Sequence, residues 1–208
     1  MLKIEWLGHS SFKLNYHNYL IVIDPFGDNV VPGLKGVHES AHIVYCSHEH
    51  KDHNARENVS LLPHSENPFK VTEINSYHDQ SMGSQRGKNK ILILQDKEVK
   101  CVHLGDIGCM PTGEELDLLM NIDVLMVPIG GHYTLNKEDV VQLIKRIKPK
   151  VIVPMHYRTE RFGYDVIGGL DDFLKLLNYD VVYYHQSFME YRSSMTSHIA
   201  VLEPKNHL

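Results

Sequence analysis

Ser47-His48-Glu49-His50-Lys51-Asp52-His53 places four side chains that can bind metal ions within six residues. The apolar residues before this stretch predict a β-strand, so the polar residues begin where the strand ends. In extended chain alternate side chains point the same way, so His48 and His50 can reach one ion. A turn after them would bring Asp52 and His53 to a second ion. This mixture of imidazole and carboxylate suits zinc, with iron and manganese as alternatives.

Further ligand-type residues follow other predicted strands. They are Asp24, His78, Asp106 and His156. Each of them alone would be an ordinary turn residue, but strand ends are where α/β folds usually place their sites. The chain also has 15 histidines, a surplus that asks for an explanation because histidine is the commonest metal ligand. Taken together, these positions indicate a metal site.

The composition bounds the class of protein. The 208 residues predict one domain, 1–208, and 42% hydrophobic residues can build its core. The net charge of −5 disfavours a general nucleic-acid binder, although a local basic patch stays open. No segment reaches the length of about 18 apolar residues that a membrane span needs, and no secretory signal is evident. Cys46, Cys101 and Cys109 form no close pair, so we expect free thiols and a cytoplasmic protein.

The hydrophobic pattern predicts strands first, followed by strands that alternate with helices. A hairpin turn is expected at 15–18. The predicted strands are 2–7, 11–14, 19–23, 42–46, 71–77, 90–95, 99–104, 124–127, 151–153, 181–184 and 198–202. Helices are predicted at 112–120, 136–148 and 170–177, the first two capped by Thr112 and Asn136. This order favours an α/β protein in which helices cover two sheets.

The order His-x-His-x-Asp-His, then His, Asp and His, resembles the metallo-β-lactamase superfamily over nearly the whole chain. Four shorter motifs are Gly8-His9-Ser10, Ile23-Asp24-Pro25, His103-Leu104-Gly105-Asp106 and Pro128-Ile129-Gly130-Gly131. They are similar to a branch of small metal-dependent hydrolases related to L-ascorbate-6-phosphate lactonase and N-acyl phosphatidylethanolamine phospholipase D. The resemblance implies a four-layer αββα sandwich, two mixed β-sheets flanked by helices, with the site at one edge between the sheets.

The resemblance also implies a binuclear site. His48, His50 and His78 would hold the first metal, Asp52, His53 and His156 the second, and Asp106 would bridge the two. Asp24 would hydrogen-bond and orient a ligand histidine. His103 would either support the ligands or be an interior histidine. Asp52 and Asp106 are the expected catalytic residues, and Asp52 could also relay a proton.

Several residues are candidate substrate contacts, each with an ordinary alternative. His9 either faces the cleft or is a turn residue. Arg86 and Lys88 either hold an anionic group or form a solvated hairpin. His132 and Tyr133 either contact substrate or connect a strand to a helix. The loops 27–38 and 158–168 would choose the substrate.

The expected function is metal-dependent hydrolysis. Two divalent ions, zinc in the first place, would activate a water molecule that attacks an ester, lactone or phosphodiester bond of a small anionic substrate. One alternative is a nuclease or phosphodiesterase acting on nucleic acid, which the chain length and charge disfavour. Another is a non-hydrolytic di-metal redox protein, which the intact His50 disfavours. The partners expected are a small molecule and, as an open question, a second copy of the chain.

Overall fold

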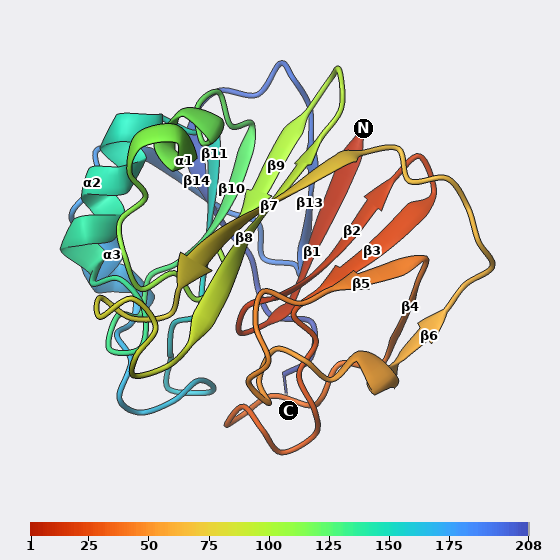
Figure 1. Cartoon of the computed structure of the whole chain (residues 1–208), viewed down its shortest axis with the longest axis horizontal. Helices are drawn as coiled ribbons and strands as arrows, with labels where there is room; N and C mark the ends of the chain where they lie inside the picture. The colour runs from red at the N-terminus through yellow and green to blue at the C-terminus, as the bar shows by residue number, and fades with distance from the viewer. Residues whose placement is uncertain (208) are drawn as a thin grey trace.

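Two β-sheets face each other in the computed structural model, which describes residues 1–207 (Figure 1). The five-stranded sheet has the order β13 (Phe188–Tyr191), β1 (Leu2–Gly8), β2 (Ser11–Tyr16), β3 (Tyr19–Ile23), β5 (Ile43–Tyr45). The seven-stranded sheet has the order β12 (Asp180–Tyr183), β14 (His198–Val201), β11 (Val151–Met155), β10 (Val124–Pro128), β9 (Lys100–His103), β8 (Lys88–Gln95), β7 (Lys70–Tyr77). β4 (Glu39–Ala41) and β6 (Val59–Leu61) form a separate short pair.

The hairpin between β2 and β3 is tighter than the predicted turn at 15–18. Asn15 and Tyr16 belong to β2, where they pair with Leu20 and Tyr19. The turn therefore consists of His17 and Asn18, with φ of 51° and 65°. Two consecutive left-handed residues are the geometry that matches the twist of a two-residue hairpin.

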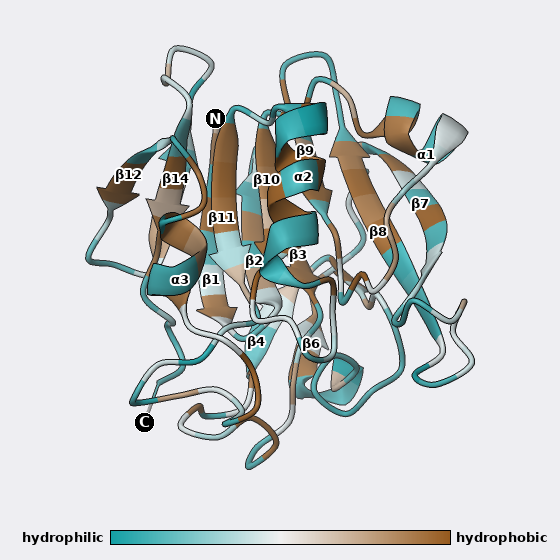
Figure 2. Cartoon of the chain, turned by 90° about the vertical axis from the view of Figure 1, so that its left-hand side faces the viewer, coloured by the Kyte–Doolittle hydropathy of each residue, from teal (hydrophilic) through white to brown (hydrophobic). Residues whose placement is uncertain are grey.

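The second sheet is mixed and supports helix α2 (Lys137–Ile147). Strands β9, β10, β11, β14 and β12 run parallel, whereas β7, β8 and β9 are antiparallel. Asn136 caps α2 by accepting a hydrogen bond from the backbone N of Asp139 at 2.8 Å, as predicted. The predicted apolar stripe of α2 is buried, and Figure 2 shows its hydrophilic face turned outward in front of β9 and β10.

The helices α1 (Gly113–Leu118), α2 and α3 (Leu170–Leu174) all lie on the side of the seven-stranded sheet (Figure 1). The mixed α/β sandwich is confirmed, but within residues 1–207 no α-helix covers the outer face of the five-stranded sheet. That face presents partly exposed polar side chains such as Lys3, Glu5 and Lys13. Because alternate residues of β1 face solvent, this sheet needs no helix to bury its outer side.

Other differences concern short elements. β13, β4 and β6 were not predicted, and α3 ends at Leu174 rather than at 177. β13 has only four residues and takes its place by pairing with β1, a partner far away in the sequence. Of residues 1–207, none belongs to a helix long and apolar enough to cross a membrane.

Truncating Ile144 tests whether α2 is held by its apolar stripe. This side chain is fully buried. Ile144→Ala should lower the free energy of unfolding by about 2–5 kcal/mol, because it removes buried methyl groups and leaves a cavity. Gln142→Ala, on the exposed face of the same helix, should change it by less than about 0.5 kcal/mol. Urea denaturation measures both, and equal effects would contradict this packing.

Candidate metal centre

The candidate site is built from turns that follow six strands at one edge of the sandwich. In the first sheet His9 follows β1, Asp24 follows β3 and Ser47 follows β5. In the second sheet His78 follows β7, Asp106 follows β9 and His156 follows β11.

Three of these turns have unusual backbone. His9, Asp24 and His156 have φ of 50°, 48° and 51°, a region that side chains other than glycine rarely adopt. Such backbone is typical of functional sites, where the surrounding structure holds it in place. Here it turns each chain sharply at the strand end.

The three histidines expected at the first metal lie together. One ring nitrogen from each of His48, His50 and His78 falls within 4.8 Å of the other two. Burial and the neighbouring His53 lower the pKa of His48 to about 3, so its imidazole is neutral at neutral pH. Neutral imidazole is the form that binds metal, and the cluster can therefore hold one ion.

Asp106 lies where the two expected metal sites meet. Its Oδ2 is 3.3 Å from His78 Nε2, 3.2 Å from His53 Nε2 and 3.1 Å from His156 Nε2. Burial alone would raise the pKa of this carboxyl, but His156 and His53 hold it well below its usual range. A buried carboxylate that contacts histidines of both clusters is suited to bridge two metal ions.

The second cluster contains one residue more than expected. His9, His53 and His156 each bring a ring nitrogen within 4.8 Å of the others. Asp52 stands beside them, with its Oδ2 at 3.3 Å from His9 Nε2 and 3.8 Å from His53 Nε2. His9 therefore lies among the candidate metal ligands, and its predicted contact with a substrate stays a prediction.

Asp24 supports histidines of both clusters, as expected for an orienting residue. Its Oδ2 is 2.9 Å from His53 Nδ1, and its two oxygens accept hydrogen bonds from the backbone N and the Oγ of Ser47, both at 2.6 Å. Ser47 Oγ in turn is 2.9 Å from His48 Nδ1. Sequence reasoning gave Ser47 no role, because a serine at a strand end carries no specific signal.

His103 is an interior histidine whose ring nitrogens are both used by the backbone. Nε2 is 2.8 Å from the carbonyl oxygen of Ser10, and Nδ1 accepts a hydrogen bond from Gly105 N at 3.0 Å. Asn89 holds the same turn, since its Oδ1 accepts a hydrogen bond from Asp106 N at 2.9 Å. These two residues shape the turn that presents Asp106, and Asn89 was not predicted.

Unpaired imidazole nitrogens show that the residues fit a metal. Within residues 1–207, His48 Nε2, His9 Nδ1 and His156 Nδ1 are buried without a hydrogen-bond partner. Buried polar atoms are usually paired, so several orphaned nitrogens in one cluster ask for a ligand. A divalent ion such as zinc satisfies neutral imidazoles and carboxylates together.

The pocket in front of the cluster has a volume of about 310 Å³. Its lining residues are His50, Asp52, His78, Arg86, Asp106, Tyr133, His156 and Tyr164. Two predicted substrate contacts, Arg86 and Tyr133, thus line the pocket. Lys88 lines an adjoining groove, and His132 lines a separate hollow on the other side of Tyr133.

Tyr164 is a pocket residue that the sequence did not single out. Its hydroxyl donates to the carbonyl oxygen of Val30 at 3.2 Å and lies 3.4 Å from Asp52 Oδ2. Val30 and Tyr164 belong to the two loops expected to choose the substrate. The structure brings these loops into contact, and Gly163 N also donates to Pro32 O at 2.9 Å.

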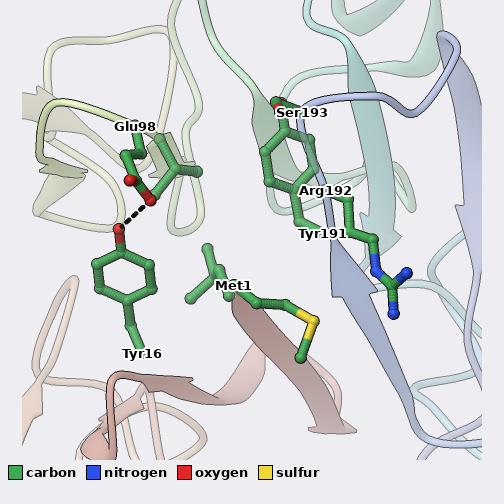
Figure 3. A pocket seen from close by; sticks show the side chains of 8 residues that line it. Met1, Tyr16, Glu98, Tyr191, Arg192 and Ser193 are labelled. Atoms are coloured by element: carbon green, nitrogen blue, oxygen red, sulfur yellow. Dashed lines mark hydrogen bonds between the residues drawn. The ribbon is translucent and has the colours of Figure 1, made fainter.

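The larger cavity in Figure 3, about 470 Å³, is not the metal site. It lies where β1 and β13 meet the turn before β9. Its lining residues are Met1, Leu2, Tyr16, Glu98, Val99, Tyr191, Arg192 and Ser193. The lining has no histidine, and the Tyr16 hydroxyl already donates to Asp96 at 2.6 Å and Glu98 at 3.3 Å.

Replacing Asp24 tests its support of the ligand histidines. Asp24→Asn keeps the shape but removes the anion that orients His53, so we expect zinc affinity to fall about 10- to 100-fold. Competition with a chromogenic chelator measures this affinity. Asp117→Asn, an exposed change on α1, is the matched control. Unchanged affinity in the Asp24 variant would show that the contact does not tune the site.

The stability of metal-free protein should depend on pH in two opposite ways. Burial opposes a charged His53, but Asp106 and Asp24 raise the pKa of its imidazole well above 6.5. The protonated His53 therefore adds to the free energy of unfolding fully below pH 6.5, and this stabilisation is lost as the pH rises through the raised pKa. Burial and nearby histidines lower the pKa of His9 to about 4 and that of His48 to about 3. The neutral forms of His9 and His48 therefore add to the free energy of unfolding fully above pH 6.5, and this stabilisation is lost as the pH falls toward those pKa values.

Urea midpoints in the presence of a chelator should therefore be highest near pH 6.5 and lower on both sides. Added zinc should remove the loss on the alkaline side, because the ion replaces the proton on His53. A midpoint that stays constant from about pH 5 to about pH 8 would contradict this assignment of charges.

Comparison with known proteins agrees with this geometry. Residues 3–156 match the family model of the β-lactamase superfamily domain, a range that includes every expected metal ligand. A UPF0173 metal-dependent hydrolase from Desulforamulus reducens is 27% identical over 76% of this chain and 85% of its own. A UPF0173 protein from Pyrococcus abyssi is 29% identical over 76% of this chain and 84% of its own.

Solved structures show the same fold. A metallo-β-lactamase superfamily structure from Thermotoga maritima has 28% identity and a TM-score of 0.75, covering 97% of this chain and 98% of its own. A metallo hydrolase from Ignicoccus hospitalis, at 19% identity, has a TM-score of 0.66 over 100% of this chain and 97% of its own, which supports the fold alone. The chain belongs to the metallo-β-lactamase superfamily.

Proposed function

We propose that this protein is a metal-dependent hydrolase with a binuclear centre, for which zinc is the best-suited metal and iron or manganese the alternatives. The observation that carries the proposal is the single oxygen of Asp106 shared by histidines of two adjoining clusters. Relatives named metal-dependent hydrolases support it. The narrower similarity to L-ascorbate-6-phosphate lactonase and N-acyl phosphatidylethanolamine phospholipase D stays a prediction.

The ligand sets follow from the two clusters. His48, His50 and His78 would hold the first ion, and Asp106 would join it to the second. The second set is Asp52, His53 and His156, to which the structure adds His9 as a neighbour of all three. Ions bound there would activate a water molecule and neutralise charge that develops on the substrate oxygen.

Asp52 is the residue placed to handle a proton. Burial alone would raise the pKa of its carboxyl, but the hydrogen bond from His9 and the nearby His53 hold it far below its usual range. The group is therefore an acceptor at neutral pH, and its Oδ2 stands at the pocket beside the Tyr164 hydroxyl. We assign Asp52 to accepting a hydrogen bond from the attacking water and so orienting it. Its lowered pKa makes it a weak base, so the relay of a proton stays a prediction from the sequence.

The substrate we propose is a small anionic molecule with an ester, lactone or phosphodiester bond. A pocket of about 310 Å³ suits a small molecule, and Arg86 in its wall supplies a cation. Lys88 extends the positive charge into the adjoining groove. The three cysteines are free thiols, which fits the reducing cytoplasm expected from the sequence. Action on nucleic acid and a redox role remain the alternatives.

Metal content is the first test of the function. Elemental mass spectrometry of protein purified without chelator should find two equivalents of metal per chain. Asp106→Asn should lower this content and reduce hydrolysis at least about 100-fold, because the shared carboxylate would be a ligand of both ions. A panel of bis(4-nitrophenyl) phosphate, 4-nitrophenyl butyrate and a simple lactone would measure hydrolysis.

Asp117→Asn is the control and should keep both metal and activity. Less than one equivalent of metal, not restored by adding zinc, would overturn the binuclear centre. Full metal content without turnover of any compound in the panel would leave the centre standing and reject these bond types.

A further inference from the structure

The loop that follows His78 is folded around a single carboxylate. Asp79 Oδ1 accepts hydrogen bonds from the backbone N of Ser81 at 2.8 Å and of Gly83 at 3.1 Å. Its Oδ2 accepts from the backbone N of Gln85 at 3.1 Å and of Arg86 at 2.8 Å. One side chain thus gathers four backbone donors of the segment 79–87 and sets its shape.

Both ends of this loop are attached to the candidate metal centre. His78 N donates to Gly87 O at 3.0 Å, which closes the loop on a candidate ligand. Gly108 packs against the backbone of His78 and Asp79 so closely that an added Cβ would lie 2.3 Å from Asp79 N. The loop is therefore attached directly to the candidate ligand His78.

Arg86 is the side chain that this loop presents. Its guanidinium lies over the ring of Tyr133, 5.0 Å from the centroid, a cation–π contact that fixes its position. The carbonyl oxygen of Tyr133 is 3.0 Å from His78 Nδ1, so the same residue steadies both the arginine and a candidate ligand. Arg86 borders the metal pocket, the groove toward Lys88 and the hollow beyond Tyr133.

The charge of Arg86 is not neutralised by the protein. Neighbouring cations of the groove are paired, Arg56 with Glu49 at 2.7 Å and Lys90 with Glu73 at 2.6 Å. Within residues 1–207 no carboxylate lies within 4 Å of the Arg86 or Lys88 head groups. A guanidinium held in place without a counter-ion is prepared to bind an anion from outside.

We propose that Arg86 binds a second anionic group of the substrate, a carboxylate or phosphate outside the bond that is cleaved, and that Asp79 is its positioning residue. The inference rests on the proposed function and deepens it. Metal ions would neutralise the oxygens of the scissile bond, so the additional cation in the pocket wall would serve a different group. The substrate class is therefore an ester, lactone or phosphodiester that carries a separate acidic group.

Two matched esters test this selectivity. 4-Nitrophenyl butyrate is neutral, whereas mono-4-nitrophenyl glutarate has a carboxylate at the end of its acyl chain. In the zinc-loaded protein, Arg86→Met should lower the ratio of kcat/KM for the charged over the neutral ester about 10- to 100-fold, mainly through KM. Asp79→Asn should change the ratio in the same direction, and the double variant should be no worse than Arg86→Met alone.

Arg146→Met and Asp171→Asn, both exposed and on α2 and α3, are the matched controls and should keep the wild-type ratio. An additive effect in the double variant would overturn the positioning role of Asp79, because the two residues would then act separately. An unchanged ratio in Arg86→Met would overturn the anion site even if Asp79→Asn fails to fold.

Binding of glutarate, followed by NMR titration, separates this inference from the proposed function. If neither ester is hydrolysed, carboxylic esters of this kind are not substrates, but the anion site is still tested by this binding. Wild-type protein should bind glutarate about 10-fold more tightly than Arg86→Met, both with zinc and with chelator. Equal affinity in the two proteins, or none in wild type, would overturn the proposal.

Discussion

The contact between the Asp106 carboxylate and three buried imidazoles is the constraint on which the site depends. A carboxylate with only 2% of its surface exposed cannot remain charged without compensation. His53, His78 and His156 supply it, and each of them comes from a different turn. Asp24 is a second buried carboxylate that is paired in the same way, with His53 and Ser47. The two buried carboxylates of the centre, Asp106 and Asp24, are therefore both paired with neighbouring side chains.

This network explains why so much of the architecture converges on one edge. Six strands from two sheets end there, and the backbone turns sharply at His9, Asp24 and His156. Left-handed backbone at a non-glycine residue costs of order 1–3 kcal/mol, so it persists only where the surrounding packing enforces it. The two sheets, with their apolar faces packed together, provide that rigidity. Side chains far apart in the sequence are thereby held close enough to share ions.

Two tyrosines beside the centre, Tyr133 and Tyr164, contact both candidate metal ligands and other parts of the pocket wall. Tyr133 steadies His78 through its carbonyl group and Arg86 through its ring. Tyr164 links Asp52 to the loop that contains Val30. The residues that hold the ligands therefore also form the walls that face a substrate. A change in either loop would reach the metal centre through these contacts.

Much of the fold and of the candidate centre could be predicted from the sequence. Alternation in β1, the caps of α2 and the dense His48–His53 motif are local signals, because the interacting residues are near one another in the chain. His9 was a candidate substrate contact or turn residue, and its place beside His156 could not be predicted because that distance depends on how the two sheets pack. Ser47, Asn89 and Tyr164 carried no specific signal, because serine, asparagine and tyrosine are ordinary turn and loop residues. β13 and the one-sided helices likewise depend on contacts between distant segments.

The sequence by itself determined which residue types can bind metal, the order in which they occur and the strands that precede them. Those properties are local, since they follow from side-chain chemistry and from the periodicity of a few consecutive residues. Only the tertiary structure decided that one oxygen of Asp106 faces histidines from three turns, that His9 lies beside His53 and His156, and that Arg86 lies over the ring of Tyr133 at the pocket. These are distances between segments far apart in the chain, and no local pattern encodes a distance of that kind.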